Sequence, residues 1–272
     1  SLIGASPWRI AMASTIGTSH IAASQPCQDS HGCNILRDSS GQPVVVLVAS
    51  DGAGSASVAD IGSALACETF VKLVADYLAN GGRVKDITRP LVERWIAGIV
   101  YGFGLHARTR GLDLGDYACT LLAAVVSEGV AAFLQIGDGA IVHSDGVGGW
   151  SWVFWPQHGE FANTTNFITS ENVREAIAFQ TSLRPFDEIA IFTDGLENLV
   201  LRKAEKEVHG PFFDSMFRSV RRSTASGMDD GLCRELDKYL ASPPINARTD
   251  DDKTLILASR RLEEVVPAGT RS

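Results

Sequence analysis

The feature that most restricts how this chain can fold is an apolar strand that ends in aspartate and glycine, and it occurs three times. The segments are VLVASDGAG (46–54), QIGDGA (135–140) and IFTDGLEN (191–198). A sheet fixes the positions of residues at its strand ends, and the glycine that follows lets the backbone turn sharply. The sequence therefore predicts a β-rich fold whose strand ends carry carboxylates that converge from distant parts of the chain.

Strands and helices are clustered along the chain rather than strictly alternating. Strands are predicted at 8–14, 29–37, 43–50, 117–126, 130–136, 139–144, 149–154, 177–182, 187–193 and 253–259. Helices are predicted at 58–78, 87–107, 211–224 and 229–240. We expect the first three strands to form a meander and the strands between 117 and 154 to pair antiparallel through short turns. This clustering is typical of an α+β layered sandwich.

Composition excludes several classes of function. With 272 residues and 45% hydrophobic side chains, the chain can bury a substantial core, and no linker divides it, so we expect a single domain over 1–272. A formal net charge of -8 argues against nucleic-acid or anionic-membrane partners. No apolar run approaches the roughly 18 residues of a membrane helix, and the start lacks a secretion signal. These features predict a cytoplasmic protein.

Motif scanning removes the commonest catalytic chemistries. The five cysteines are irregularly spaced, which is typical of reduced thiols, and none has the arginine six residues later that a cysteine phosphatase needs. Glycine-rich nucleotide loops, the serine hydrolase elbow and the H-E-x-x-H zinc motif are also absent. The six histidines lack the pairings of a zinc site. What remains is carboxylate chemistry.

Oxygen ligands favour hard divalent cations, and two such ions about 3.5 to 4 Å apart can clamp a phosphoryl group and activate a water. The candidate acids are Asp29, Asp51, Asp138, Asp194 and the TDDDKT run at 249–254. Each also has a simpler interpretation. Asp138-Gly139 could be a hairpin turn, as Asp145-Gly146 is expected to be, and the acidic run could be a solvated loop. No single motif decides between them.

The order and spacing of the whole set resemble the metal-dependent protein phosphatases, the protein phosphatase 2C family, and its bacterial branch in particular. The resemblance extends over about residues 8–260. Its landmarks, in order, are Gln28-Asp29, the D-G-x-G of Asp51 to Gly54, the threonine-bearing strand Asp116 to Leu121, Gly137-Asp138, the T-D-G of Thr193 to Gly195, and Asp251 to Thr254. Each motif is short, and their common register carries the resemblance.

The resemblance implies two antiparallel β-sheets packed as a central sandwich, helices on both outer faces, and a metal cleft at one end. It implies two magnesium or manganese ions and a third, weaker one. The implied metal ligands are Asp29, Asp51, the Gly52 carbonyl, Asp138, Asp194 and Asp251. Asp51 would bridge the two ions, Asp194 and Asp251 would complete one, and Asp138 would help to hold the third.

The implied activity is hydrolysis of phosphoserine or phosphothreonine by a water activated between the two ions, with Asp51 and Asp194 as the catalytic carboxylates. The expected partners are a phosphorylated protein and a cognate serine/threonine kinase, and the chain is expected to act as a monomer. Residues 155–175 match the position of a flap beside the active site. Its aromatic side chains either contact the substrate or pin the loop to the body.

Several positions depart from the family pattern. Gln28 replaces a frequent glutamate, Ser24 stands where many relatives have a phosphate-gripping arginine, and Ala53 replaces a histidine. His20 is the nearest alternative cation for the substrate phosphate. Asp252 replaces an asparagine, so it competes with Asp251 for the ligand role.

These departures keep a second hypothesis open, a pseudophosphatase or phosphoprotein-binding module with little turnover. A third hypothesis is an enzyme that hydrolyses a small phosphorylated metabolite. Retention of the carboxylates favours the enzyme, since acids that repel one another have no purpose without a metal.

Overall fold

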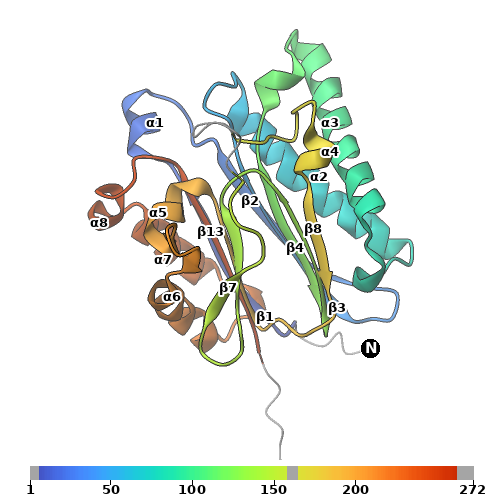
Figure 1. Cartoon of the computed structure of the whole chain (residues 1–272), viewed down its shortest axis with the longest axis vertical. Coiled ribbons are helices and arrows are strands. Elements are labelled where there is room, and N and C mark those ends of the chain that lie inside the picture. Colours follow the sequence, from blue (N-terminus) through green and yellow to red (C-terminus); the bar gives the residue numbers. More distant parts are fainter. Residues whose placement is uncertain (1–5, 158–164, 262–272) are drawn as a thin grey trace, which may run out of the picture.

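Two β-sheets pack face to face and helices cover both outer faces in the computed structural model, which describes residues 6–157 and 165–261 (Figure 1). The six-stranded sheet has the order β12 (Gly227–Met228), β1 (Trp8–Thr15), β13 (Lys253–Arg260), β9 (Glu188–Phe192), β6 (Ala140–Ser144), β7 (Trp150–Trp152). The five-stranded sheet has the order β2 (Asp29–Arg37), β3 (Pro43–Asp51), β4 (Leu121–Ser127), β5 (Val130–Ile136), β8 (Ala178–Ser182). The predicted sandwich is confirmed. Its strand pairs are antiparallel except for the short β1–β12 pair.

Long helices cover the two sheets. The five-stranded sheet carries α2 (Ala59–Ala79) and α3 (Arg89–Arg110), and the six-stranded sheet carries α6 (Gly210–Arg222) and α7 (Asp230–Leu240). The shorter elements are α1 (Thr18–Ala22), η1 (Val84–Asp86), η2 (Leu114–Tyr117), α4 (Val173–Ala176), η3 (Asp194–Leu196), α5 (Glu197–Val200), β10 (Leu201–Arg202), β11 (Glu207–Val208) and α8 (Pro243–Asn246). No helix within residues 6–157 and 165–261 is long and apolar enough to cross a bilayer.

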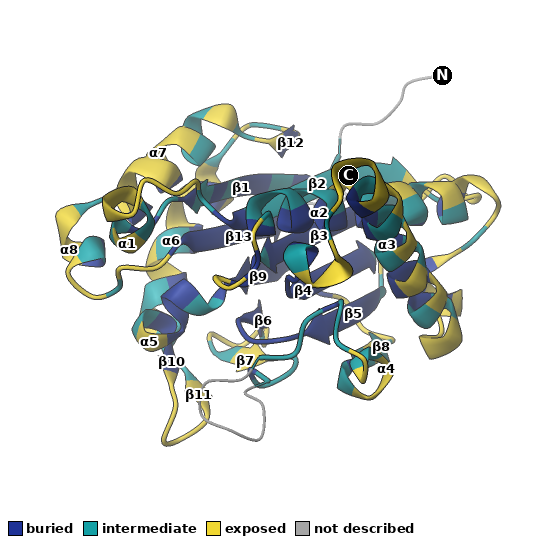
Figure 2. Cartoon of the chain, turned by 90° about the horizontal axis from the view of Figure 1, so that it is seen from above, coloured by how far each residue is buried: buried dark blue, intermediate teal, exposed yellow. Residues whose placement is uncertain are grey.

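The central strands are buried on both faces, which explains their continuous apolar sequences. Along β3, Val46 and Val48 face α2 and α3, whereas Val45 and Leu47 face the opposite sheet. Removing such a side chain from water stabilises the fold by about 1.5–3 kcal/mol. Figure 2 shows the central strands of both sheets as a buried layer, with most exposed residues on helices and loops. Strand ends held by this packing make a rigid support for functional groups.

The predicted pairing of neighbouring strands is wrong in two places. The strand at 8–14 does not form a meander with the next two, because β1 pairs with β13 in the other sheet. Strands β5 and β6 do not form a hairpin either, since β5 pairs with β4 and β8 while β6 pairs with β7 and β9. Gly137 to Gly139 therefore cross from one sheet to the other. The turn at Asp145 does close the β6–β7 hairpin as predicted.

The strand predicted from residue 117 begins only at Leu121. Residues Leu114–Tyr117 form the 3-10 turn η2, which starts with a capping box between Asp113 and Asp116. Side-chain oxygens that accept from the backbone favour such turns over strand pairing. The short helices α1 and α8 and the short strands β10 to β12 were not predicted, because elements of two to five residues have too little periodicity to stand out.

Candidate active site

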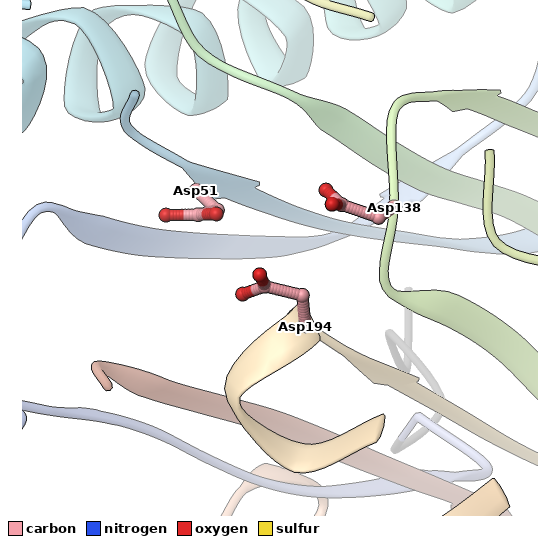
Figure 3. Close-up of side chains that lie close together, drawn as sticks. All are labelled: Asp51, Asp138 and Asp194. Carbon is pink, nitrogen blue, oxygen red and sulfur yellow. The ribbon is translucent and has the colours of Figure 1, made fainter. Parts of the chain in front are cut away.

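Three aspartates from separate segments meet at the end of the sandwich. Asp51 ends β3, Asp138 lies in the crossover between β5 and β6, and Asp194 begins η3 after β9 (Figure 3). One carboxylate oxygen from each lies within 4.8 Å of the other two. All three follow the strand–Asp–Gly pattern of the sequence. The structure thus brings together the carboxylates that this pattern singled out.

Asp51 is held by the start of the neighbouring strand. The Thr120 hydroxyl accepts a hydrogen bond from the Asp51 backbone N–H at 2.9 Å, and Thr120 N–H donates to the Asp51 carbonyl at 2.8 Å. Gly52 then passes so close to α2 that a Cβ there would lie 2.7 Å from the Ala59 carbonyl oxygen. Only glycine fits at this position, so the D-G pair is required by packing as well as by the turn.

Asp194 begins a turn that packs directly against the acidic run near residue 250. A Cβ on Gly195 would lie 1.9 Å from the Asp252 carbonyl oxygen, so glycine is needed for this approach. Leu196 is fully buried in the core under α6 and α7. This contact fixes the direction in which Asp194 leaves the strand.

Asp29 lies directly opposite Asp51 in the β2–β3 register and is 5% exposed. Its Oδ2 accepts hydrogen bonds from the Thr193 hydroxyl at 2.6 Å and the Thr254 hydroxyl at 2.7 Å. Its Oδ1 is buried and accepts no hydrogen bond from a hydroxyl or N–H group of the described residues, and the nearby Asp51 carboxyl can share a proton with Asp29. A buried carboxylate oxygen without a donor fits a role as a cation ligand, either directly or through water.

Burial and mutual repulsion make this cluster unfavourable in its fully ionised form. Desolvation, followed by the charges of Asp138 and Asp251, raises the pKa of Asp194 to about 8. Desolvation also raises the pKa of Asp29 to about 6 and that of Asp51 well above its usual range, where the charges of Asp29 and Asp194 add to it. Protons or bound cations must neutralise such a group. The atoms that this cluster offers to a metal ion are all carboxylate oxygens, the ligand type that magnesium and manganese prefer.

The two acids at 251 and 252 have different surroundings. Asp252 is 2% exposed, and its carboxylate accepts from Gly17 N–H and Gln28 N–H, each at 2.6 Å. Both of its oxygens are therefore already used to hold the 17–28 segment. Asp251 is exposed, and its charge helps to raise the pKa of Asp194. It borders the cluster but is not one of the three aspartates whose carboxylate oxygens lie within 4.8 Å of one another.

His20 points to the second of these acids. Its Nδ1 lies 2.9 Å from Asp252 Oδ2, and its side chain is 15% exposed. The contact gives His20 a structural partner, so its assignment to the substrate phosphate stays a prediction.

Sequence reasoning missed the polar groups that orient these acids. The hydroxyls of Thr120, Thr193 and Thr254 support Asp51 and Asp29. Their positions inside the DYACTL, T-D-G and D-D-K-T motifs were the available signal. Which aspartate each hydroxyl meets depends on how the strands pair and the sheets pack, which no local pattern shows.

The described part of the segment 155–175 is attached to the body of the protein. The Thr165 hydroxyl donates to Asp138 Oδ2 at 2.7 Å, and Ile168 N–H donates to the Cys119 carbonyl at 2.9 Å. Trp155 packs on the core beneath α6 and α7, and Phe167 packs beside Ala53. These two aromatic residues therefore pin the loop. Phe161, the third aromatic residue for which substrate contact or loop attachment was expected, lies outside the described residues.

Comparison with known proteins identifies the relatives of this chain. Residues 16–240 match the family model described as protein phosphatase 2C. The chain is 36% identical over 252 residues to "Serine/threonine-protein phosphatase 3" of Escherichia coli (strain K12), covering 92% of this chain and 98% of that protein.

Solved structures with the same fold have low sequence identity. The catalytic domain of the serine/threonine protein phosphatase PstP, in complex with two manganese ions, has a TM-score of 0.57 at 13% identity and covers 93% of this chain and 97% of its own. PppA of Pseudomonas aeruginosa has a TM-score of 0.58 at 17% identity, and the match covers 94% of this chain and 99% of PppA.

Proposed function

The chain belongs to the protein phosphatase 2C family, and on that premise we propose that it is a metal-dependent serine/threonine protein phosphatase with its active site at the acidic cluster. The observation that carries the proposal is the convergence of Asp51, Asp138 and Asp194 within 4.8 Å of one another. The named relative that covers most of this chain is itself a serine/threonine-protein phosphatase. The comparisons give no support to a binding module without turnover.

The residues proposed to hold two divalent cations, magnesium or manganese, and a weaker third are Asp29, Asp51, the Gly52 carbonyl, Asp138, Asp194 and Asp251. The oxygen-only donor set and the donor-free Oδ1 of Asp29 support this assignment. Bound cations of this kind supply an activated water as nucleophile and neutralise the charge that develops on the phosphoryl oxygens.

The chain's own residues prepare the cleft for this chemistry. Asp51 and Asp194 are the proposed catalytic carboxylates, as the family resemblance implies, and both are held beside strands that pack in the core. Thr193 and Thr254 hold one oxygen of Asp29, and the other is buried without a hydrogen bond from a hydroxyl or N–H group of the described residues. The support from these hydroxyls fixes the acids before substrate arrives, so little reorganisation is needed during reaction.

A covalent route through cysteine does not fit the site. Cys27 is close enough to the cluster for Asp29 and Asp252 to influence its ionisation. Burial, and then these two charges, raise the pKa of its thiol far above the usual range. The thiol therefore stays protonated at neutral pH and is a poor nucleophile. Direct attack by water on phosphorus needs no protein nucleophile.

We further propose that residues 8–260 form one catalytic domain and that 155–175 act as a flap beside the cleft. The hydrogen bond from Thr165 to Asp138 supports this placement. We also propose that its substrate is a phosphorylated protein, that a serine/threonine kinase opposes it, and that it acts as a monomer. The cytoplasmic location stays a prediction from the sequence.

Substrate class separates this proposal from its alternatives. Purified protein with manganese is expected to release phosphate from phosphoserine and phosphothreonine peptides at least about tenfold faster than from the matched phosphotyrosine peptide. Excess EDTA should abolish release, and added manganese should restore it. The assay is phosphate release from three peptides that differ only in the phosphorylated residue.

Three results would contradict the proposal. Equal rates on phosphotyrosine would remove the serine/threonine assignment. Manganese-dependent binding of the peptides without release would support the pseudophosphatase, and release from small phosphate esters alone would support a metabolite phosphatase.

A further inference from the structure

Glu197 is a buried carboxylate near the cluster that none of the proposed metal roles uses. It begins α5, three residues after Asp194, and is 2% exposed. Its Oε1 accepts a hydrogen bond from the Gly139 backbone N–H at 2.8 Å. Its Oε2 lies 3.0 Å from the Lys203 ammonium, which is half-exposed on the loop between β10 and β11. Glu197 therefore ties the turn that carries Asp138 to the segment that carries Asp194.

The Asp138 turn needs such external support because its backbone has little stiffness of its own. Asp138 stands between Gly137, with φ of 99°, and Gly139, with φ of 77°. Glycine has the largest conformational freedom in the unfolded chain. A stiffer residue cannot replace Gly139, since a Cβ there would lie 2.5 Å from the Phe192 carbonyl oxygen. The turn must therefore be fixed by groups outside it.

Polar side chains from three other segments surround this turn. Gln135 donates from Nε2 to the carbonyls of Gly137 and Gly139 at 3.2 and 3.3 Å. Gln157 Oε1 accepts from Gly137 N–H at 3.0 Å. Glu197 is the charged member of this set, and it holds the residue that directly follows Asp138. A charged acceptor makes a stronger hydrogen bond than a neutral one.

Lys203 offsets the charge of Glu197. Its ammonium lies 3.0 Å from the second carboxylate oxygen, so the pair carries little net charge. The hydrogen bond to Gly139, rather than the charge, is therefore the support that Glu197 gives to the Asp138 turn.

We propose that Glu197 is a positioning residue that holds Asp138 within reach of Asp51 and Asp194, and that it thereby sets the affinity for the divalent cation that Asp138 shares. Lys203 keeps the carboxylate paired in its buried position. The inference rests on the proposed function, because it takes the three aspartates as cation ligands. Glu197 itself touches neither substrate nor phosphate.

Two substitutions separate the hydrogen bond from general structural support. Glu197→Gln keeps an oxygen that can accept from Gly139, whereas Glu197→Ala removes it. We expect Glu197→Ala to weaken manganese binding by about 10- to 100-fold, the usual cost of losing a partner that orients a metal ligand. Glu197→Gln combined with Lys203→Met, which leaves no unpaired ammonium, should stay within about threefold of wild type.

The measurement is calorimetric titration of the EDTA-stripped, dialysed protein with manganese chloride, followed by phosphopeptide kinetics at each metal concentration. For Glu197→Ala we expect a lower kcat at low manganese that recovers at saturating manganese, with KM for peptide unchanged. Exposed Glu205→Ala, on the same β10–β11 segment, is the matched control and should behave as wild type.

The outcomes distinguish this inference from the proposed function. Wild-type manganese affinity in folded Glu197→Ala overturns the positioning role and leaves the phosphatase in place. If the Gln/Met double variant loses as much manganese affinity as Glu197→Ala, the hydrogen bond to Gly139 is not what positions Asp138, and the inference is overturned. If wild type binds manganese but releases no phosphate, the function fails while the affinities still test Glu197. Absence of manganese binding in wild type overturns both.

Discussion

Asparagine at Asp51 or at Asp194 is expected to lower kcat on a phosphothreonine peptide by about a thousandfold or more, equivalent to at least about 4 kcal/mol of transition-state stabilisation. Asparagine has nearly the same size as aspartate, so the packing of the strand end is retained. It removes one anionic oxygen from a cluster whose carboxylates lie within 4.8 Å of one another. The proposed cations lose a ligand charge, and the site loses its ability to activate water.

Asp145→Asn provides the matched control. Asp145 is also followed by glycine after an apolar strand, but it lies in the β6–β7 hairpin, where its Oδ1 accepts from Val147 and Gly149 N–H at 2.9 and 2.8 Å. Asparagine keeps this acceptor, so the control should retain full activity. Folded Asp51→Asn and Asp194→Asn proteins with the same kcat as Asp145→Asn would show that the cluster is not the active site.

The second large effect is on stability. Without divalent metal, the free energy of unfolding is expected to fall as pH rises from about 4 to about 8. Asp194 has its pKa raised to about 8 and Asp29 to about 6, mainly by desolvation. An unfolded aspartate titrates at about 3.9, so the native state holds more protons than the unfolded state across this range. Stability present at low pH is lost as pH rises, by up to about 1.4 kcal/mol per pH unit for each group that stays protonated.

Urea unfolding in EDTA at pH 5, 6, 7 and 8 measures this loss. Asp194→Asn should show a flatter dependence, since its amide does not titrate, and Asp145→Asn should follow wild type. Manganese at about 100 times its Kd should restore about 2.7 kcal/mol at pH 8, because it binds the native state alone. Rising stability between pH 5 and pH 8 in EDTA would contradict a protonated, repulsive cluster.

Local sequence patterns correctly predicted those elements whose physical cause lies in neighbouring residues. Strand β3 and strand β4 are continuous apolar runs because both of their faces are buried. Helix α3 was predicted to end at 107 and ends at Arg110, where Gly111 adopts a φ of 68° in the left-handed region that closes helices. The aspartates at strand ends were predictable as well, because apolar strand, aspartate and glycine are contiguous in sequence.

Non-local contacts explain what the sequence could not show. The Gly137–Gly139 turn looks like a hairpin, since two apolar strands flank it, but its strands belong to different sheets. Asp251 and Asp252 differ only through the 17–28 segment that packs against Asp252 and uses both of its oxygens. Glu197 meets Gly139 across 58 residues of chain. Each of these depends on the order of strands in the sheets, which pattern and propensity do not determine.

The central claim is that acids from distant segments of the chain share divalent cations at one site. Crystals grown with manganese and measured at the manganese absorption edge test it most directly. We expect anomalous peaks about 2.2 Å from carboxylate oxygens of Asp51 and Asp194, a distance typical of oxygen ligands. A well-ordered map from a protein active in the same buffer, with no peak within reach of Asp51, would contradict the account.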